Sequence, residues 1–387
     1  MAIQNVNPRA KIIIATSTTF AINSFFEHHI QKLATSFDLI IVSDNEGHAL
    51  LASISEVVDF ENMRIRRQPS LFHDLMVVFK FIALIEKHKP TVILTMTPKV
   101  GLLFAIAGAI TRVSVRVHII TGQVWQNYSG LKRFIYKLYD RALIALITRP
   151  LADSRSQIDY LIEQGVSPKG RIEVLANGSV TGVDLELFKP NPQLRTSFRQ
   201  KLGLSDNDRV VLFLGRLVED KGIFDAVEAV ARVSEKLDDI YFWCAGPDEI
   251  HASEKVRQLA NSRRINYHYF GKVKTTFDLF CSADVLILPS RREGFGSVII
   301  EAAACGVPAV AYKTYGVSDA IVDQNTGLLA DYGDIDDLAR NLLYLLESTT
   351  VNRGYGARAR ARAAKQFNKS ILVNRLYDII EKDIAML

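Results

Sequence analysis

The stretch VLILPSRREGFGSVIIE, residues 285–301, indicates the fold more directly than any other part of the chain. Four consecutive apolar residues, 285–288, predict a buried strand that ends at Pro289, and the apolar pattern after Gly296 predicts a helix. Between the two, Gly294 and Gly296 allow tight backbone geometry and a close approach of a ligand to main-chain amides. A strand, a turn and a helix in this order are typical of α/β proteins with parallel sheets.

The same alternation of short β-branched runs and helical patterns continues in both directions. In the first half we predict strands at 11–15, 39–42, 92–95, 115–120 and 173–175, and helices at 25–35, 74–88, 101–111, 132–147 and 156–164. In the second half we predict strands at 210–214, 240–245, 267–270, 285–288 and 309–311, and helices at 223–236, 253–262, 276–281, 297–304 and 335–347. The pattern favours an α/β protein with two doubly wound, Rossmann-like domains that face a shared central cleft.

The length of 387 residues fits two domains. We expect the first domain to span residues 1–176 and the second to span residues 193–365. The segment 177–192 contains two glycines and two prolines, which predicts a hinge between them. A final helix over residues 366–387 is expected to return to the first domain.

Composition excludes several classes of protein. The widely spaced Cys244, Cys281 and Cys305 lie among apolar or small residues, so they are expected to be buried thiols rather than metal ligands or a disulfide framework. No apolar run approaches the roughly 20 residues that cross a bilayer. The amino terminus also lacks the pattern of a secretion signal. We therefore expect a soluble chain or one bound to a membrane surface.

Positive charge is concentrated in one segment, although the net charge of the whole chain is only +5. Residues 62–150 carry 14 Lys and Arg side chains against 3 acidic ones, a net charge of +11. Such a segment attracts phosphates on nucleic acid, anionic lipid or a diphosphate-bearing substrate. No known RNA- or DNA-binding motif accompanies it, so we do not expect a nucleic-acid partner.

Two glutamates in the quoted stretch are candidate ligand contacts. Glu293 falls in the loop and Glu301 lies about one turn into the helix. A carboxylate has two acceptor oxygens, enough to bind the cis-diol of a ribose or a sugar ring. The alternative for Glu301 is a helix cap, but with Ser297 as the cap the reciprocal position is Ile300. The helix amino terminus beside the loop favours an anion.

A second group of charged residues lies in LFLGRLVEDKG, residues 212–222. Here a predicted strand ends at Gly215, so Arg216 and Lys221 fall in a strand-to-helix loop at the carboxyl edge of the sheet, where this topology binds ligands. Two fixed cations can stabilise the charge on a departing nucleoside diphosphate without a metal. The alternative is that they pair with Glu219 and Asp220.

Together, Gly215-Arg216 with Lys221-Gly222 and Glu-Gly-Phe-Gly-x4-Glu over 293–301 are similar to the motifs of the retaining glycosyltransferases of family 4, which have the two-domain GT-B fold. The resemblance extends over nearly the whole chain. Further matches are Ala152-Asp-Ser154, Asn177-Gly178, Val183-Asp184, Phe188, Gly306-Val-Pro308 and Gly327-Leu-Leu329.

The resemblance implies a role for each matching residue of the donor site. Arg216 and Lys221 would bind the donor diphosphate. Glu301 would bind the ribose hydroxyls, and Glu293 would contact the transferred sugar. Arg216, Lys221 and Glu293 are the expected catalytic residues. Further expected donor contacts are the main-chain amides of Gly294, Phe295 and Gly296, the turn that ends at Val273, and Ser17 in the loop after the first strand.

The first domain departs from the family pattern at the acceptor loop. Many relatives carry a histidine just before the loop glycine, whereas this chain has Thr121 before Gly122. His118 lies three residues earlier, on a predicted strand, where a core position is the alternative to a catalytic one. Lys99, at a helix start, is the expected contact for an acceptor phosphate. We therefore name Lys99, Thr121, Gly122 and His118 as acceptor-site candidates.

The segments 97–103 and 121–125 resemble those of enzymes that act on polyprenyl-diphosphate-linked sugars in bacterial capsule and O-antigen assembly. The implied reaction moves a hexose or N-acetylhexosamine, with its anomeric configuration retained, from a nucleotide sugar to a lipid-linked saccharide. UDP is the expected carrier and GDP the alternative, and no metal or other cofactor is expected. The helix over 131–149 mixes basic and apolar residues, which suits an anionic membrane surface, here the inner face of the cytoplasmic membrane. The alternative is a core helix with a basic rim.

Three other functions compete with this prediction. A metal-dependent transferase needs an Asp-x-Asp motif, which occurs at 206–208 and 334–336, but the first is expected to be a turn and the second a helix cap. A nicotinamide oxidoreductase needs Gly-x-Gly-x-x-Gly after a strand, and neither half contains it. A two-lobed sugar-binding protein without transferase activity would explain Glu301 but not Arg216 with Lys221.

Overall fold

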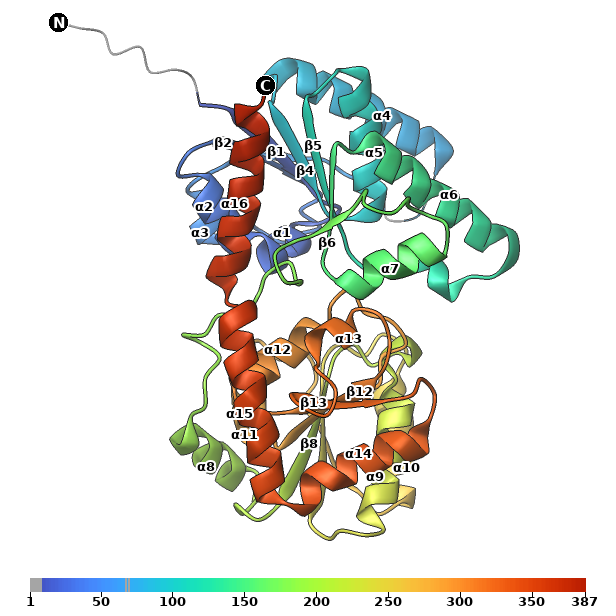
Figure 1. The fold of residues 1–387 in the computed structure, drawn as a ribbon, viewed down its shortest axis with the longest axis vertical. Helices are drawn as coiled ribbons and strands as arrows, with labels where there is room; N and C mark the ends of the chain where they lie inside the picture. The colour runs from blue at the N-terminus through green and yellow to red at the C-terminus, as the bar shows by residue number, and fades with distance from the viewer. Residues whose placement is uncertain (1–8, 67, 69) are drawn as a thin grey trace, which may run out of the picture. The chain divides into compact units, whose positions relative to one another are not determined.

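The computed structural model of the chain describes residues 9–66, 68 and 70–387. Residues 1–8 of the predicted first domain, and Arg67 of the basic segment, lie outside the described residues. The chain divides into two compact units, the first made of residues 1–176 and 370–387 and the second of residues 177–369 (Figure 1).

The described part of the first unit contains a seven-stranded parallel sheet with the strand order β3-β2-β1-β4-β5-β6-β7. The strands are β1 (Lys11–Ala15), β2 (Asp38–Ser43), β3 (Asp59–Asn62), β4 (Val92–Thr95), β5 (Val115–Ile120), β6 (Arg149–Ala152) and β7 (Glu173–Val174). The helices are α1 (Thr19–Phe25), α2 (Glu27–Leu33), α3 (Ala52–Ser55), α4 (Leu71–His88), α5 (Pro98–Ile110), α6 (Gly130–Leu146), α7 (Arg155–Glu163) and α16 (Lys369–Ala385), with the 3-10 helix η1 (Val124–Asn127).

The central strands of this sheet are apolar on both faces because helices cover both. In β1 the residues Ile12, Ile13 and Ile14 are all fully buried. Ile13 pairs in register with Ile40 of β2 on one side and with Ile93 of β4 on the other. The chain leaves β1 in one direction and returns to place β4 on its other side, so the strand order reverses between β1 and β4.

The described part of the second unit contains a six-stranded parallel sheet with the order β10-β9-β8-β11-β12-β13. The strands are β8 (Arg209–Leu214), β9 (Ile240–Ala245), β10 (Asn266–Tyr269), β11 (Val285–Leu288), β12 (Ala309–Tyr312) and β13 (Gly327–Ala330). The helices are α8 (Pro192–Lys201), η2 (Glu219–Lys221, a 3-10 turn), α9 (Ile223–Ser234), α10 (Ala252–Ser262), α11 (Phe277–Ser282), α12 (Ser297–Ala304), α13 (Val317–Ala320), α14 (Ile335–Glu347) and α15 (Thr349–Gln366). Here the order reverses between β8 and β11.

Alternate residues of β8 enter two different cores. Val210, Leu212 and Leu214 belong to the apolar cluster on one face of the sheet. Val211 and Phe213 belong to the cluster on the other face. This two-sided burial explains why the strand is a continuous apolar run and does not alternate with polar residues.

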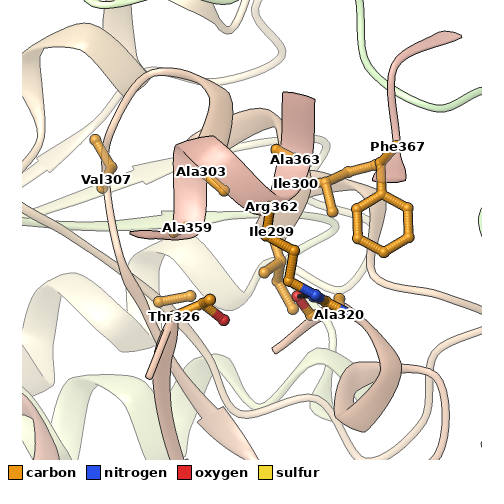
Figure 2. Close-up of a pocket in the computed structure, with 11 residues that line it drawn as sticks. Ile299, Ile300, Ala303, Val307, Ala320, Thr326, Ala359, Arg362, Ala363 and Phe367 are labelled. Atoms are coloured by element: carbon orange, nitrogen blue, oxygen red, sulfur yellow. Dashed lines mark hydrogen bonds between the residues drawn. The ribbon is translucent and has the colours of Figure 1, made fainter. Parts of the chain in front are cut away.

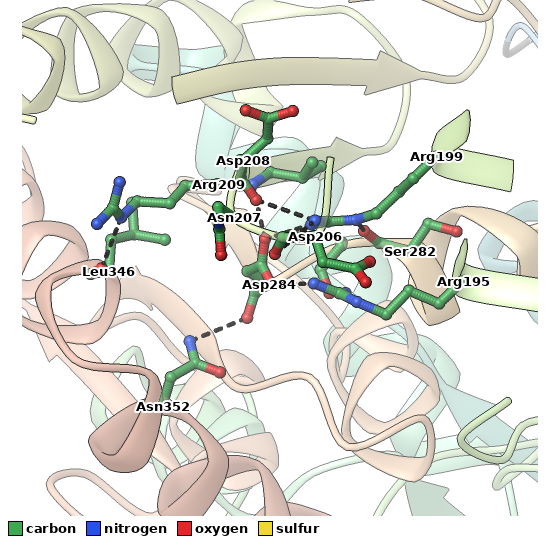
Figure 3. A network of polar contacts seen from close by, with 12 residues as sticks. Arg195, Arg199, Asp206, Asn207, Asp208, Arg209, Ser282, Asp284, Leu346 and Asn352 are labelled. Carbon is green, nitrogen blue, oxygen red and sulfur yellow. Dashed lines mark hydrogen bonds and ion pairs between the residues drawn. The ribbon is translucent and has the colours of Figure 1, made fainter. Parts of the chain in front are cut away.

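A partly buried ionic network fixes the amino ends of β8 and β11. The Asp284 carboxylate accepts hydrogen bonds from Arg195 and Arg199 of α8, each at 2.6 Å, and from the Val210 main-chain N–H at 2.8 Å (Figure 3). The Arg199 side chain is fully buried and also donates to the main-chain oxygens of Ser205 and Asp208. The network therefore joins α8 to the two strands at which the strand order reverses.

The chain returns to the first unit through α16. Arg149 of β6 pairs with Asp383 of this helix at 2.5 Å, and Ser36 shares a 2.8 Å hydrogen bond with Tyr377. The buried face of α16 is apolar and includes Leu376 and Ile380. No helix in the described part of the chain is both long and apolar enough to cross a membrane.

The predicted α/β fold class is confirmed, and the strands predicted at 11–15, 92–95, 115–120, 240–245 and 285–288 have the bounds observed. The helix predicted at 25–35 is wrong in its start, because the chain forms α1 from Thr19 and breaks at Phe26 before α2. The Thr18 hydroxyl caps α1 by accepting from the Ala21 N–H. The loop after β1 therefore ends at Thr18, earlier than the sequence predicted. The strands β3, β6 and β13 were not predicted.

Candidate functional site

The candidate site of the second unit lies where the strand order reverses. The loop after β8 contains Arg216 and Lys221, and the loop after the neighbouring β11 contains Glu293. In open α/β sheets, ligands bind at the carboxyl ends of the strands at this switch point. The two loops touch, because a Cβ atom on Gly222 would lie 2.0 Å from the Pro289 main-chain oxygen. Gly222 also has a φ of +72°, in the left-handed region that favours glycine.

Lys221 and Glu293 form a direct ion pair across the two loops. The Lys221 Nζ lies 2.5 Å from Glu293 Oε1, and the Ser290 hydroxyl donates to the same oxygen at 2.8 Å. Both side chains are largely shielded from solvent, at 21% and 13% exposed. The structure therefore brings together two of the predicted site residues. The alternative pairing of Lys221 with its neighbours Glu219 and Asp220 is not observed, because Asp220 pairs with Arg292 at 3.3 Å.

Arg216 has a partner that the sequence did not suggest. Its Nη1 lies 2.9 Å from Glu249 Oε2, and both side chains are about half exposed. An exposed pair of this kind contributes at most about 1 kcal/mol, so an incoming phosphate can replace the carboxylate at little cost. Arg216 is thus held near the carboxyl edge of the sheet in an arrangement that a ligand can change.

Glu301 differs from Glu293 because no cation in the described chain pairs with its carboxylate. In the described chain, no side chain or main-chain N–H donates a hydrogen bond to its carboxylate, and burial raises the pKa of this group from 4.5 to about 7. A half-buried carboxylate with unused acceptors is suited to hydroxyl donors from a ligand. The geometry is compatible with the predicted diol-binding role.

The helix that carries Glu301 is firmly packed. Ile299, Ile300 and Ala303 of α12 face Ala363 and Phe367 around a cavity of only about 10 Å³ (Figure 2). Gly296, the residue just before the first turn of α12, has a φ of +74°. Since this packing leaves little free volume, α12 holds Glu301 at a fixed position relative to the β11 loop.

The loop after β12 supports the Glu293 loop from the other side. A Cβ atom on Gly316 would lie 2.5 Å from the Glu293 main-chain oxygen and 2.6 Å from that of Gly294. The Thr314 hydroxyl donates to the Ser290 main-chain oxygen at 3.2 Å. Sequence reasoning missed Ser290, Thr314 and Gly316. The position of Ser290 directly after a buried strand was the one available signal.

The remaining predicted donor contacts fall at the same sheet edge or in the core. The Gly246 N–H donates to the Gly271 oxygen at 2.9 Å, and Gly246 packs so closely on Gly215 that a Cβ would lie 1.9 Å from its oxygen. The turn that ends at the half-buried Val273 therefore lies beside the β8 loop. The Phe295 ring is buried against Phe367, with ring centres 5.1 Å apart, so only its main chain can reach a ligand.

In the first unit the switch point lies between β1 and β4, and Ser17 is located there. Its main-chain N–H donates to the Thr97 hydroxyl at 3.0 Å. Lys99, two residues further, does not have the free ammonium group that we expected. Its Nζ lies 2.6 Å from Asp74 Oδ1 and donates to the main-chain oxygens of Arg66 and Gln68, both at 2.7 Å. Two N–H donors are thus used by main-chain oxygens and the charge is paired with Asp74, which argues against Lys99 as an acceptor-phosphate contact.

His118 is a core residue and does not line a surface site. Its ring is 2% exposed and its Nδ1 lies 2.7 Å from the Thr95 hydroxyl. A Cβ atom on Gly101 would lie 2.5 Å from the ring, so glycine is required there. Burial lowers the pKa of His118 to about 3, which leaves the ring neutral. The acceptor role expected for His118 is therefore corrected to a packing role.

The acceptor-loop candidates Thr121 and Gly122 directly follow β5. The Gly122 main-chain N–H lies 2.7 Å from the amide oxygen of Gln157, once that amide is oriented to satisfy its neighbours. Gln157 is fully buried in α7 and also donates to Asp153. The loop is thus held by a side chain from the next helix, with the Thr121 side chain partly exposed.

The two Asp-x-Asp motifs have the local roles expected of them. Asp208 accepts from the Ser205 N–H at 2.6 Å within a turn. Asp334 caps α14 by accepting from the Asp337 N–H at 2.8 Å. Among residues 9–66, 68 and 70–387, no cluster of three or more His, Cys, Asp or Glu side chains is arranged to hold a metal ion.

Comparison with known proteins places these features in a family. Residues 195–363 match the model described as "Glycosyl transferases group 1", and residues 34–178 match the "Glycosyl transferase 4-like domain". The capsular polysaccharide biosynthesis glycosyltransferase CapM of Staphylococcus aureus is 28% identical over 344 residues, which cover 88% of this chain and 89% of that one. The N-acetyl-alpha-D-glucosaminyl L-malate synthase of Bacillus anthracis is 24% identical over 251 residues, 59% of this chain and 65% of that one.

Solved structures of other proteins share the fold. Sucrose-phosphate synthase from Thermosynechococcus elongatus superposes with a TM-score of 0.82 at 18% identity, over 98% of this chain and 100% of that one. HepE from Anabaena, in complex with UDP and glucose, superposes with a TM-score of 0.78 at 20% identity, over 96% and 100%. Together with the two family models, which account for both units, these findings show that the chain belongs to the family 4 glycosyltransferases and has the GT-B fold.

Proposed function

We propose that this glycosyltransferase moves a hexose or N-acetylhexosamine from a UDP-sugar to a lipid-linked saccharide during the assembly of a bacterial surface polysaccharide. We further propose that it retains the anomeric configuration and needs no metal or other cofactor. The Lys221–Glu293 ion pair at the switch point of the second sheet is the observation that carries this proposal. It places a cation for phosphate and a carboxylate for sugar hydroxyls 2.5 Å apart.

The diphosphate, the transferred sugar and the ribose of the donor each match a charged group of the second unit. The diphosphate would bind Lys221 and, after its exposed pair with Glu249 opens, Arg216. The transferred sugar would donate hydroxyl hydrogen bonds to Glu293. The ribose diol would donate to Glu301, whose half-buried carboxylate has no hydrogen-bond donor from the described chain. UDP is the proposed nucleotide, and the UDP complex of HepE supports it as an analogy of fold.

The chemistry follows from the same charges. When the bond between the anomeric carbon and the diphosphate oxygen breaks, the departing phosphate gains negative charge, and Lys221 and Arg216 stabilise it. The acceptor hydroxyl forms the new bond to the anomeric carbon and transfers its proton to the departing phosphate. Neither step requires a side chain as general base.

The proposed acceptor is a saccharide on a polyprenyl diphosphate, presented at the inner face of the cytoplasmic membrane. The likeness to CapM, named for capsular polysaccharide biosynthesis, supports this class of product. Thr121, Gly122 and Ser17 are the first-unit residues that we keep as ligand contacts, because each lies in a loop at the carboxyl end of a strand.

The test begins with thermal shifts against UDP, GDP and their sugar conjugates. Transfer to a lipid-linked acceptor is then followed by mass spectrometry, with and without EDTA. We expect UDP-sugar binding, an EDTA-insensitive product, and a Glu293→Gln variant that binds UDP but loses at least about 100-fold in turnover, the range typical of removing one transition-state contact. The matched control is Glu235→Gln, which removes an exposed carboxylate of the second unit at the carboxyl end of α9, away from the β8 and β11 loops. Binding without transfer or nucleotide release would instead support a sugar-binding protein.

A further inference from the structure

The first turns of α4 expose large apolar side chains to solvent. Leu71 is 92% exposed, Phe72 77% and Phe79 62%, and Leu75 and Met76 are also exposed. The opposite side of the same helix is buried through residues such as Phe81 and Leu84. The helix therefore has one apolar face in the core and a second one that nothing in the described chain covers.

A second exposed apolar face lies on α6. Leu131 is 73% exposed, and Phe134, Ile135 and Leu138 are each more than half exposed. Their spacing of three and four residues places them on one side of the helix. A core helix with a basic rim would bury these residues, so the exposure removes that alternative for α6. Its buried residues, Leu143 and Ile144, lie near the other end.

The two faces belong to neighbouring helices of one unit. Both α4 and α6 pack against α5, and the three lie side by side in Figure 1. Lys99, in the first turn of α5, binds Asp74 of α4. Burial, and after it the charge of Asp74, raises the pKa of Tyr139 of α6, so Asp74 and Tyr139 are close. The exposed residues of α4 and α6 therefore border the same end of α5.

The charges beside these apolar faces are positive. Lys132, Arg133, Lys137 and Arg141 all lie on α6. Burial and the neighbouring Arg133 and Arg141 lower the pKa of Lys137, as expected for clustered cations. The acids nearby are already used, since Asp140 accepts from Trp125 Nε1 at 2.7 Å and Asp74 binds Lys99.

Charge decides which partner fits. A second copy of the chain related by a two-fold axis would bring two cationic helices together, which costs free energy. An anionic bilayer offers acyl chains to the apolar residues and phosphates to the cations.

We propose that α4 and α6 form one docking surface for an anionic lipid bilayer. Leu71, Phe72, Leu75 and Phe79 of α4 and Leu131, Phe134, Ile135 and Leu138 of α6 enter the boundary between headgroups and acyl chains. Lys132 binds a lipid phosphate, while Arg133, Lys137 and Arg141, whose N–H groups also donate to Gln164 and Gly165, add positive charge beside it. Such a surface would bring the enzyme to an acceptor in the membrane, and only the lipid-linked nature of that acceptor rests on the proposed function.

The experiment measures binding of the full chain to vesicles of phosphatidylglycerol and phosphatidylethanolamine in equal parts, by co-sedimentation without donor or acceptor. Vesicles of phosphatidylcholine alone are the neutral comparison. We expect Leu71→Ser with Phe72→Ser to weaken partition at least about tenfold. We expect Lys132→Gln to weaken it about fivefold at low salt. In a Phe72→Trp variant, added indole emission should shift to the blue and be quenched by brominated acyl chains.

The matched control is Val57→Ser, which removes an exposed apolar residue of the same unit, beside His88 at the other end of α4 from the exposed apolar residues. It should bind as the wild type does, and circular dichroism melts check that every variant is folded. Wild-type partition by the folded Leu71→Ser, Phe72→Ser variant overturns the proposal. So does a concentration-dependent dimer that the same variant dissociates. Vesicle binding needs no nucleotide sugar, so its failure leaves the transferase assignment intact, and a failure of transfer leaves the docking result intact.

Discussion

At the scale of single residues, the two glutamates of the site differ in how their charge is balanced. Glu293 pairs with Lys221 and accepts a hydrogen bond from Ser290. Glu301 has a pKa raised to about 7 by burial alone. Near neutral pH the unliganded protein therefore holds one carboxylate that is paired and one that is partly protonated.

Glu301 makes the stability of the protein depend on pH. Its pKa rises from 4.5 to about 7 on folding, so the folded state keeps the proton between these values while the unfolded state loses it. The contribution of this group to the free energy of unfolding therefore falls as the pH rises from about 4.5 to about 7. We predict that Glu301→Gln, which cannot ionise, gains stability over the wild type across this window. Urea unfolding at several pH values measures the difference in free energy of unfolding between Glu301→Gln and the wild type.

The same variant should weaken UDP binding, because an amide supplies only one acceptor oxygen to the ribose diol. Glu235→Gln is again the control, since Glu235 is exposed and lies away from the site loops. A stability gap that is constant from pH 4.5 to 8 would contradict the assignment of the raised pKa to Glu301.

The residues found from the sequence are those that a local pattern identifies. Glu293, Glu301 and Lys221 stand at fixed spacings from glycines, and the structure brings the Lys221–Glu293 pair together. The partners Ser290 and Glu249 were missed because their role depends on which loops meet, and no local spacing encodes that. Lys99 shows the converse error, since a lysine at a helix start is compatible with an anion site until a carboxylate such as Asp74 is found to occupy it.

At the scale of elements, the site depends on loops that approach one another more closely than side chains would allow. Gly222 lies against Pro289, and Gly316 lies against Glu293 and Gly294. The loops after β8, β11 and β12 thus form one contact layer at the carboxyl edge of the sheet. Its shape is set by main-chain contacts at glycines.

We predict that Gly222→Ala destabilises the second unit and weakens UDP binding. The new Cβ would lie 2.0 Å from the Pro289 oxygen, so the two loops must separate. Overpacking of this kind costs about 1–3 kcal/mol. The matched control is Gly333→Ala, which has a similar φ of +82° but no atom within 4 Å of the new Cβ. The extra loss in Gly222→Ala over Gly333→Ala, measured by thermal unfolding, isolates the loop contact. Equal losses would assign the effect to backbone strain alone.

Strands were predictable from sequence where they are buried on both faces. The interiors of both sheets, such as β1, β4 and β11, consist of apolar runs that periodicity detects. The edge strand β3 is DFEN and largely exposed, so it carries no apolar signal. Pro150 inside β6 argues against a strand in any sequence reading, although the structure accommodates it between β5 and β7.

At the scale of the whole molecule, the last helix completes the first unit after the chain has built the second. The apolar face of α16 is buried, and Asp383, with a side chain 9% exposed, is paired with Arg149. The chain passes between the units twice, after Ala176 and after Lys369. Beside these passages, the Val183 N–H donates to Phe367 and the Lys369 N–H donates to Val183.

We predict that Arg149→Ala destabilises the first unit by about 2 kcal/mol, because it leaves the shielded Asp383 carboxylate without its charged partner. Urea unfolding followed by circular dichroism measures the change. Arg155→Ala is the control, since its pair with Asp159 spans 3.6 Å between side chains that are more than half exposed. That control should change stability by less than about 0.5 kcal/mol. If both variants unfold alike, the α16 contact does not contribute as proposed.

The double passage of the chain limits how hybrid enzymes can be made from this protein. A gene fusion with one junction after Ala176 would combine the first 176 residues with a foreign α16, whose apolar face evolved against another sheet. A chimera that exchanges the first unit must therefore carry two junctions, one after Ala176 and one before Ser370. Under the proposed function, in which the second unit binds the donor, residues 177–369 are the continuous segment to transplant when only donor preference is to be changed.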